Sequence, residues 1–302
     1  MRVRKCVAAT AVAATGLSGL VLGSGTATAD SACPDTYVVA VPGTWETGVD
    51  KDDNVRGGGM LAGVTEGLPG TMRVDYVDYS ATAFPWEGDV YGASEKEARD
   101  NARGLIADMA AHCGGTKYAI VGYSQGADAA GDVAAEIGTG HGVVPADKVV
   151  AVGLVSDPKR SPADTQVGPP VGGSGAEGAR PGGFGQLTDR VRTVCAEGDL
   201  YCATEDTDYI SRLAGFVAAV SGGNAADMWR YQLQAVNLAS DLMSHGGIGA
   251  LQSQLTGDAN EQRVKQIEDF YGTGYHTSYG TYAVGGGQTA ISWMHSFIAG
   301  AA

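Results

Sequence analysis

The sequence has little positive charge. Lysine and arginine number 20 against 34 aspartates and glutamates, which leaves a net charge of −14 over 302 residues. A chain of this sign repels phosphate backbones, so we exclude a nucleic-acid partner. The motifs G-x-x-x-x-G-K-S/T and H-E-x-x-H are both absent. Nucleotide binding and catalytic zinc are therefore unsupported, and we expect no metal and no cofactor.

A calcium-binding loop is also excluded. The acidic stretch 50–54 begins with the right spacing, but position six of such a loop would be Val55 instead of glycine. Position twelve would be Leu61 instead of glutamate. We expect a solvated acidic loop there.

Long hydrophobic runs are missing except at the N-terminus. Residues 1–29 have a basic start, an apolar stretch from Val7 to about Gly23 and an A-x-A site at residues 27–29. This pattern is typical of a secretory signal peptide, with residues 30–302 as the mature domain. A transmembrane anchor is the weaker alternative, because the stretch is short and rich in glycine and alanine. We expect a secreted protein without a stable membrane span; retention in the cell envelope and oligomeric state stay open.

Cysteine is scarce, and its number is informative. Removal of the signal peptide leaves Cys33, Cys113, Cys195 and Cys202. Four cysteines in an exported chain predict two disulfides, for which three pairings exist; free buried thiols are the alternative. Cys195 and Cys202 are close enough in sequence to close one loop, and a bond between Cys33 and Cys113 would then tie the N-terminus to the end of a helix.

Short β-rich runs alternate with helical stretches along the mature chain. Several of the runs are apolar on both faces, as strands between two helix layers are. A Ser94–Glu97 capping box predicts a helix toward His112, and residues 126–137 are Ala-rich and helical. The pattern predicts an α/β fold, a three-layer α/β/α sandwich with a mostly parallel central sheet. The expected strands are 37–41, 72–77, 118–121, 149–155 and 191–194.

Two segments interrupt this alternation. Residues 157–187 are dense in proline and glycine, which predicts a long loop. Residues 204–271 contain no convincing strand, and their apolar residues keep helical spacing, as in Ile210, Leu213 and Phe216. We expect a helical insertion or lid at 204–271.

The strongest chemical signal is Gly122-Tyr-Ser-Gln-Gly126, a G-x-S-x-G pattern. It lies directly after the predicted strand 118–121 and directly before the predicted helix. In that setting a serine is forced onto a tight turn, and the helix N-terminus adds positive potential beside a developing oxyanion. We predict Ser124 as a nucleophile; an ordinary glycine-rich turn is the alternative.

A serine nucleophile needs a histidine base, and in this fold class the base follows the serine in sequence. That order leaves His245, His276 and His295. His295 lies inside the apparent C-terminal helix 289–298, and His245 opens a Gly-Gly stretch at a helix end. We predict His276 as the base, because its loop just before the last helix can reach over the sheet toward Ser124.

The base in turn needs a carboxylate to orient it. Asp199 follows the strand 191–194 and lies between Cys195 and Cys202, so that a disulfide loop would fix its position. Glu197 is the local alternative for this role. Asp199 could instead be an ordinary solvated turn residue. We favour Asp199 because it occurs together with the serine and the histidine.

These motifs occur in the order of a known family. The chain resembles the cutinase family of secreted serine esterases in four patterns. They are Gly122-Tyr-Ser-Gln-Gly-Ala127, Cys195-x-x-Gly-Asp-x-x-Cys202, His276-x-x-Tyr279, and the start Cys33-Pro-Asp with Pro42-Gly-Thr-Trp-Glu-Thr-Gly48. The resemblance covers roughly residues 33–203 and 272–300. It implies an α/β-hydrolase fold, a triad of Ser124, Asp199 and His276, and an oxyanion hole from the backbone N–H groups of Thr44 and Gln125. It also implies the disulfides Cys33–Cys113 and Cys195–Cys202.

The chain departs from compact cutinases in one respect. Asp199 and His276 are 77 positions apart, where those proteins have a short loop. Mycolyl-ester hydrolases of cutinase-like fold resemble the chain better here, because they too carry a helical insertion between the aspartate and the histidine. We expect a secreted serine carboxylic-ester hydrolase that cleaves lipophilic acyl esters of lipids or polyesters. A cell-envelope glycolipid is the alternative substrate. A catalytically inactive exported protein that binds lipid or glycan is the alternative from another class.

Overall fold

The computed structural model describes residues 33–47, 57–223 and 225–302. The expected signal peptide, residues 1–29, and the acidic stretch 50–54 lie outside the described residues. None of the described helices combines the length and the hydropathy that a membrane crossing requires.

A parallel sheet of five strands forms the centre of residues 33–302, in the order β2-β1-β3-β4-β5. The mostly parallel sheet expected from the sequence is confirmed, and each strand matches one of the five predicted runs to within two residues at either end. The strands are β1 (Thr36–Val41), β2 (Met72–Tyr76), β3 (Lys117–Tyr123), β4 (Val149–Val155) and β5 (Val191–Val194).

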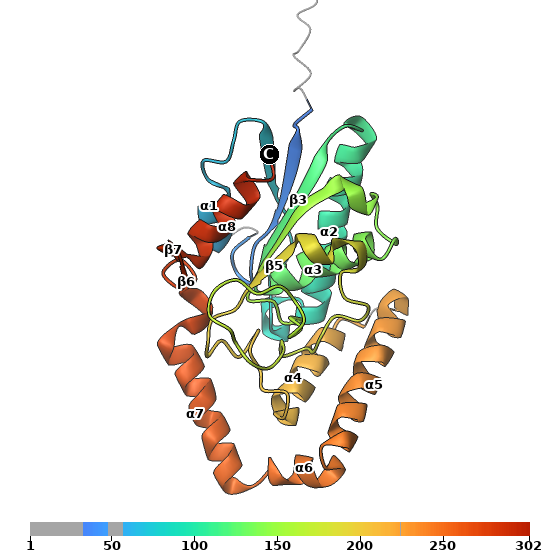
Figure 1. The fold of residues 1–302 in the computed structure, drawn as a ribbon. Coiled ribbons are helices and arrows are strands. Elements are labelled where there is room, and N and C mark those ends of the chain that lie inside the picture. The colour runs from blue at the N-terminus through green and yellow to red at the C-terminus, as the bar shows by residue number, and fades with distance from the viewer. Residues whose placement is uncertain (1–32, 48–56, 224) are drawn as a thin grey trace, which may run out of the picture. The chain divides into compact units, whose positions relative to one another are not determined.

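Helices cover both faces of this sheet (Figure 1). Successive side chains of a strand point to opposite faces. In β1, Val39 and Val41 belong to the core shared with α2 (Tyr91–His112) and α3 (Gln125–Gly138), whereas Val38 belongs to the core shared with α1 (Ala62–Thr65) and α8 (Ala290–Ala299). Both faces of the strand are therefore apolar, and the three-layer α/β/α sandwich is confirmed.

The start of α2 differs from the prediction. The helix begins at Tyr91 rather than near Ser94, and Val90 occupies the N-cap position. Ser94 is buried inside the helix, where its hydroxyl accepts a hydrogen bond from the backbone N–H of Thr82 at 3.0 Å. The capping-box pattern was misleading because Ser94 is used for a tertiary contact.

Between β5 and the last helix the chain forms four helices within residues 209–273, at the carboxyl end of the sheet (Figure 1). We call residues 204–273 the helical segment. The preceding residues 157–184 contain neither helix nor strand. A short antiparallel pair, β6 (Ala283–Gly285) and β7 (Gln288–Thr289), leads into α8. The helices of the segment are α4 (Tyr209–Val220), α5 (Met228–Ser244), α6 (Gly247–Ser253) and α7 (Gly257–Thr273).

Short 3-10 helices connect several of these elements. They are η1 (Gly59–Leu61), η2 (Pro85–Glu87), η3 (Ala146–Lys148), η4 (Gly185–Arg190), η5 (Ala225–Asp227) and η6 (Tyr275–Thr277).

The end of α4 packs against the start of α2 through backbone contact. The N–H of Gly92 donates to the hydroxyl of Ser221 at 3.0 Å. A Cβ atom on Gly92 would lie 2.5 Å from the carbonyl oxygen of Ala219, which is closer than real Cβ contacts. A side chain at position 92 would therefore push α4 away from α2.

We predict that alanine at the two glycines of α2 has opposite effects on the stability of the fold. Gly92→Ala should destabilise the fold by about 1–3 kcal/mol, because the added methyl overpacks a backbone contact. Gly104→Ala is the matched control: a Cβ there meets no atom within 4 Å, and the better helix former should stabilise by about 0.5–1 kcal/mol. Urea unfolding of both variants measures this. Equal stability of the two variants would contradict the tight α2–α4 contact.

Candidate active site

The sheet order locates a site before any side chain is considered. β2, the strand that follows β1 in sequence, lies on one side of β1. β3 lies on the other side of β1, and β4 and β5 continue the sheet in that direction. In open α/β sheets, ligands bind outside the carboxyl ends of the strands at such a switch point. Ser124 directly follows β3 and Thr44 comes three residues after β1, so the sheet brings both to this point.

Ser124 occupies a strained turn between β3 and α3. Its φ is 57° and its ψ is −127°, a conformation that residues with a side chain seldom adopt. A Cβ on Gly122 would lie 2.3 Å from the carbonyl oxygen of Gly126, and one on Gly126 would lie 2.0 Å from that of Val41. The two glycines of the motif are therefore required by close backbone contacts.

Ser124, His276 and Asp199 are joined by hydrogen bonds. The Oγ atom of Ser124 lies 2.8 Å from Nε2 of His276. The other ring nitrogen, Nδ1, lies 3.1 Å from both carboxylate oxygens of Asp199. Glu197, the alternative carboxylate, is exposed, whereas Asp199 is fully buried. The structure thus brings the three predicted residues together in the order serine, histidine and aspartate.

The other two candidate histidines lie elsewhere. His245 is exposed at the end of α5, and its Nδ1 lies 2.9 Å from the carbonyl oxygen of Asp241. His295 packs within α8, with Nδ1 2.9 Å from the carbonyl oxygen of Val64. Each ring is thus engaged by a backbone carbonyl away from Ser124.

Two hydroxyl groups next to Asp199 were not assigned a role from the sequence. Ser156, just after β4, donates to Oδ2 of Asp199 at 2.6 Å and lies 3.0 Å from Nδ1 of His276. Tyr279 donates to the same Oδ2 at 2.6 Å. The backbone N–H of Tyr201 donates to Oδ1 at 3.0 Å. Asp199 is therefore surrounded by donors that favour its ionised form.

The pKa of Asp199 reflects this environment. Burial by itself would raise the pKa of the carboxyl group. The hydrogen bond and the charge of His276, followed by the hydrogen bonds of Ser156 and Tyr279, outweigh burial and lower the pKa below its usual value. A buried carboxylate that stays ionised can hold the imidazole in one tautomer and stabilise its protonated form.

Both implied disulfides are present. The bond between Cys195 and Cys202 closes the short loop that carries Asp199. The bond between Cys33 and Cys113 links the chain just before β1 to the residue directly after α2. The first bond restricts the loop of Asp199, and the second restrains the start of the described chain.

The predicted oxyanion donors lie on neighbouring segments. The hydroxyl of Thr44 donates to the side-chain oxygen of Gln125 at 3.2 Å. Among the described residues, neither the backbone N–H of Thr44 nor that of Gln125 has a hydrogen-bond acceptor. Glu46 holds the Thr44 loop, because its carboxylate accepts from the N–H groups of Gly43 at 2.9 Å and Met60 at 2.8 Å. Within the part of the chain that the structure describes, both N–H groups are thus available to a ligand beside the start of α3.

A network of buried charges lies beside the site, between α2, α3 and the loop 157–187. We call it the buried charge network. Arg99 on α2 pairs with Asp227, and so links the network to the helical segment. Arg180 pairs with Asp157 at 2.6 Å and with Asp132 at 2.8 Å. Its members are Glu95, Arg99, Asp128, Asp132, Asp157, Lys159, Glu177, Arg180 and Asp227.

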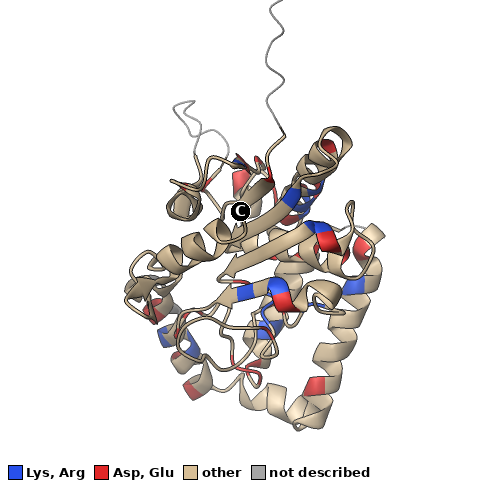
Figure 2. Ribbon diagram, turned by 45° about the horizontal axis from the view of Figure 1, so that its top comes forward, with Lys and Arg blue, Asp and Glu red and all other residues tan. Residues whose placement is uncertain are grey.

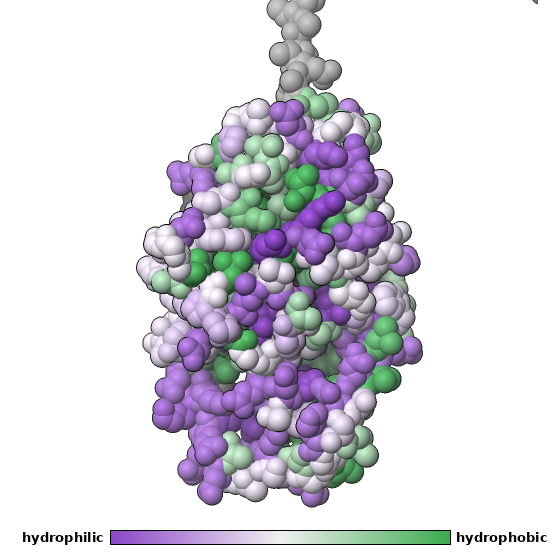
Figure 3. Space-filling view, viewed as in Figure 1, coloured by the Kyte–Doolittle hydropathy of each residue, from purple (hydrophilic) through white to green (hydrophobic). Residues whose placement is uncertain are grey.

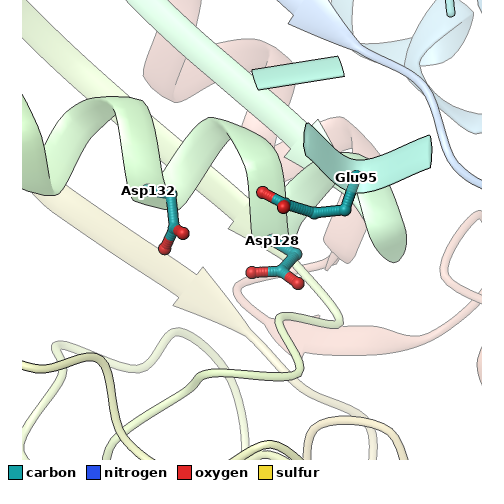
Figure 4. Close-up of side chains that lie close together, drawn as sticks. All are labelled: Glu95, Asp128 and Asp132. Carbon is teal, nitrogen blue, oxygen red and sulfur yellow. The ribbon is translucent and has the colours of Figure 1, made fainter. Parts of the chain in front are cut away.

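Three carboxylates of this network have the spacing of metal ligands. Glu95, Asp128 and Asp132 each offer an oxygen, and these atoms lie within 4.8 Å of one another (Figure 4). However, Nζ of Lys159 lies 2.6 Å from Asp128 and 3.1 Å from Asp132. Burial works against ionisation of Asp132, but Lys159 and Arg180 hold its pKa well below the usual range. We therefore interpret the group as part of an ion-pair network.

A buried parallel sheet with a serine on a strained turn, next to a histidine and a carboxylate, is the arrangement of an α/β-hydrolase. The Cutinase family model matches residues 32–226, more than half of the chain. The chain belongs to the cutinase family. The matched range includes Ser124 and Asp199 and ends before His276, within the helical segment.

Individual proteins are similar to this chain over part of its length. A carboxylesterase Culp6 homolog of Corynebacterium glutamicum is 32% identical over 204 residues, which is 56% of this chain and 65% of that protein, just under two thirds of its length. Cutinase CUT1 of Coprinopsis cinerea is 30% identical over 173 residues, 57% of this chain and 71% of that protein. The solved structure of a cutinase-like protein from Cryptococcus sp. has a TM-score of 0.43 at 19% identity, over 64% of this chain and 96% of that one.

We predict that Tyr279→Phe destabilises the protein in a pH-dependent manner. The variant loses a hydrogen bond to an ionised carboxylate, which should cost about 2 kcal/mol at neutral pH. A lowered pKa in the folded state stabilises the fold above the unfolded value, about 3.9 for aspartate. That contribution disappears as the pH falls through the folded pKa.

The difference in the free energy of unfolding between wild type and Tyr279→Phe should therefore become smaller below about pH 4. Urea unfolding from neutral to acidic pH measures it. A difference that stays constant over this range would show that Tyr279 acts only through packing.

Proposed function

We propose that the protein is a serine carboxylic-ester hydrolase with Ser124, His276 and Asp199 as its catalytic triad. The observation that carries the proposal is the 2.8 Å contact between Oγ of Ser124 and Nε2 of His276. The two groups belong to segments that are 152 positions apart in sequence. A nucleophile and a base at hydrogen-bond distance, with the base oriented by a third group, are the elements that covalent ester cleavage requires.

The proposed reaction has two steps. Oγ of Ser124 attacks the ester carbonyl carbon while Nε2 of His276 takes the serine proton, and the same proton then passes to the leaving alcohol. Water next attacks the acyl-enzyme, loses a proton to His276 and releases the acid, and the proton returns to Ser124. Asp199 orients the imidazole throughout. The N–H groups of Thr44 and Gln125 bind the tetrahedral oxyanion, each contributing roughly 3 kcal/mol.

We further propose a lipophilic acyl substrate that the helical segment covers. Charged residues are sparse on α5 and absent from α6 (Figure 2). The described helices of the segment expose large hydrophobic side chains among hydrophilic ones (Figure 3). Exposed apolar side chains that gather into a contiguous patch mark surfaces that contact lipid or other apolar ligands, and we propose that role for those of the segment. They include Leu213, Val217, Leu233, Val236, Met243, Ile248 and Val264.

The segment also reaches the proposed base. The ring of Phe270 on α7 lies 5.7 Å from that of His276, so the far end of the segment borders the triad. This position favours a cover over the acyl site rather than a separate domain. A cell-envelope glycolipid with a long acyl chain is the second candidate substrate, because a cover of this length suits a long chain.

We predict that Ser124→Ala lowers kcat for p-nitrophenyl esters by at least about 10⁴-fold. Ser296→Ala on α8 is the matched control and should keep full activity. Esters from acetate to palmitate should show a maximum at medium or long chains. Activity on acetate alone would indicate a deacetylase. If a fluorophosphonate fails to label the wild type and no ester is cleaved, the protein is a binding protein without the chemistry.

We also propose that the protein is exported, with retention in the envelope left open. The two disulfides are of the kind that forms in oxidising compartments. Expression in a secreting host should release a mature chain that begins at Asp30, as N-terminal sequencing measures. A product that keeps residues 1–29 would contradict the cleavage site and favour an anchor.

A further inference from the structure

A second serine lies on a strained turn next to that of Ser124. Ser124 directly follows β3 with a φ of 57°, and Ser156 directly follows β4 with a φ of 56°. Each donates its backbone N–H to the last residue of the next strand in the sheet, Val155 for Ser124 and Val194 for Ser156, both at 2.9 Å. Positive φ at a residue with a side chain is costly, and such strain gathers at functional sites.

The residue after Ser156 is fixed by buried charge. The carboxylate of Asp157 accepts two hydrogen bonds from the guanidinium of Arg180, at 2.6 and 3.0 Å, and one from the backbone N–H of Lys159 at 3.0 Å. Ser156 is therefore held by the sheet through its own N–H and by the buried charge network through its neighbour. Glycine adopts a positive φ without strain, so the backbone of this turn does not favour a serine.

The hydroxyl of Ser156 contacts two members of the proposed triad at once. The side chain is fully buried, and its Oγ donates to Oδ2 of Asp199 at 2.6 Å and lies 3.0 Å from Nδ1 of His276. A hydroxyl has one proton, and the carboxylate takes it, so a lone pair of Oγ faces Nδ1. Because Nε2 accepts from Ser124 in the proposed reaction, the neutral imidazole carries its proton on Nδ1. Ser156 thus accepts from the same N–H that Asp199 binds.

A comparison with Tyr279 shows what is particular to Ser156. Both hydroxyl groups donate to Oδ2 of Asp199 at 2.6 Å, but of the two it is the hydroxyl of Ser156 that also contacts Nδ1 of His276. Nδ1 therefore has three oxygens around it at 3.0–3.1 Å, two from Asp199 and one from Ser156. A ring whose N–H faces three fixed acceptors is restrained in rotation, and preset orientation of this kind lowers a reaction barrier.

We propose that Ser156 is a positioning residue of the hydrolase, whose hydroxyl holds the imidazole of His276 and the carboxylate of Asp199 in the orientation that the reaction requires. This role rests on the proposed function, since it adds a fourth residue to the triad. Ser156 acts through the base and the carboxylate, and no bond to the substrate forms at its oxygen. Loss of the hydroxyl should therefore lower kcat and leave KM nearly unchanged.

The test replaces Ser156 by glycine and by alanine. Ser156→Gly removes the hydroxyl together with the strain, so it should be at least as stable as Ser156→Ala in urea unfolding. Both variants should lower kcat for p-nitrophenyl octanoate roughly ten- to fiftyfold, with KM changed by less than about twofold, because a hydrogen bond to a charged group is lost. Ser174→Ala is the matched control and should keep full activity. Ser174 is also buried, and it donates to the carboxylate of Asp206 at 3.0 Å.

Tyr279→Phe separates orientation of the base from support of the carboxylate. It removes the other hydroxyl on Oδ2 of Asp199 and leaves the contacts of Nδ1 in place, so kcat should fall less than in Ser156→Gly. Proton NMR gives a second measurement that a merely structural role would not change. The low-field resonance of the Nδ1–H of His276 should move further from its wild-type position in Ser156→Gly than in Tyr279→Phe.

An unchanged kcat in Ser156→Gly, a loss no larger than that of Tyr279→Phe, or a loss that lies in KM would overturn the proposal. If wild type cleaves no ester, the proposed function fails, and the Nδ1–H resonance decides the inference separately. A resonance that is the same in wild type and Ser156→Gly would then show that the hydroxyl does not hold the imidazole. A displaced resonance would keep Ser156 as the residue that orients His276 in a site without the chemistry.

Discussion

The proposed chemistry depends on one close backbone contact, between the turn after β3 and the end of β1. A Cβ on Gly126 would lie 2.0 Å from the carbonyl oxygen of Val41 and 2.2 Å from that of Pro42. The two segments can be this close only because the residue is glycine. Their approach places the N-terminus of α3 beside the loop of Thr44. The contact brings the two proposed oxyanion residues, Thr44 and Gln125, within hydrogen-bond distance of each other beside Ser124.

Much of the fold could be predicted because its signals are local. The strands are short runs that are apolar on both faces, and a sheet covered by helices on both faces requires such runs. The turn at Ser124 was predictable for a similar reason. A glycine pair around a serine, between a strand and a helix, describes a steric requirement that is written within five consecutive residues. The loop of Asp199 was marked by its two cysteines.

Other features depend on contacts that a sequence does not display. Ser156 is one serine at the end of a strand, and only the neighbouring position of β5 brings it to Asp199. Tyr279 was visible as part of a motif, but its bond to Asp199 spans 80 positions. Ser94 had the pattern of a helix cap, and a tertiary contact with Thr82 used it instead. The helices after residue 204 could be predicted from spacing, but their arrangement could not.

The buried charge network has an evolutionary consequence. Its members come from α2, α3, the loop 157–187 and the chain just before α5, and they are shielded from water. Loss of an ionised member such as Asp132 leaves its cationic partners buried without a counter-charge, which typically costs about 3–5 kcal/mol, whereas replacement of a whole set by apolar residues can be neutral. Single substitutions are therefore selected against while joint ones are tolerated. Descendants of this chain should keep or lose the residues of the buried charge network together. Their joint presence in a related sequence should therefore indicate that it also has the helical segment.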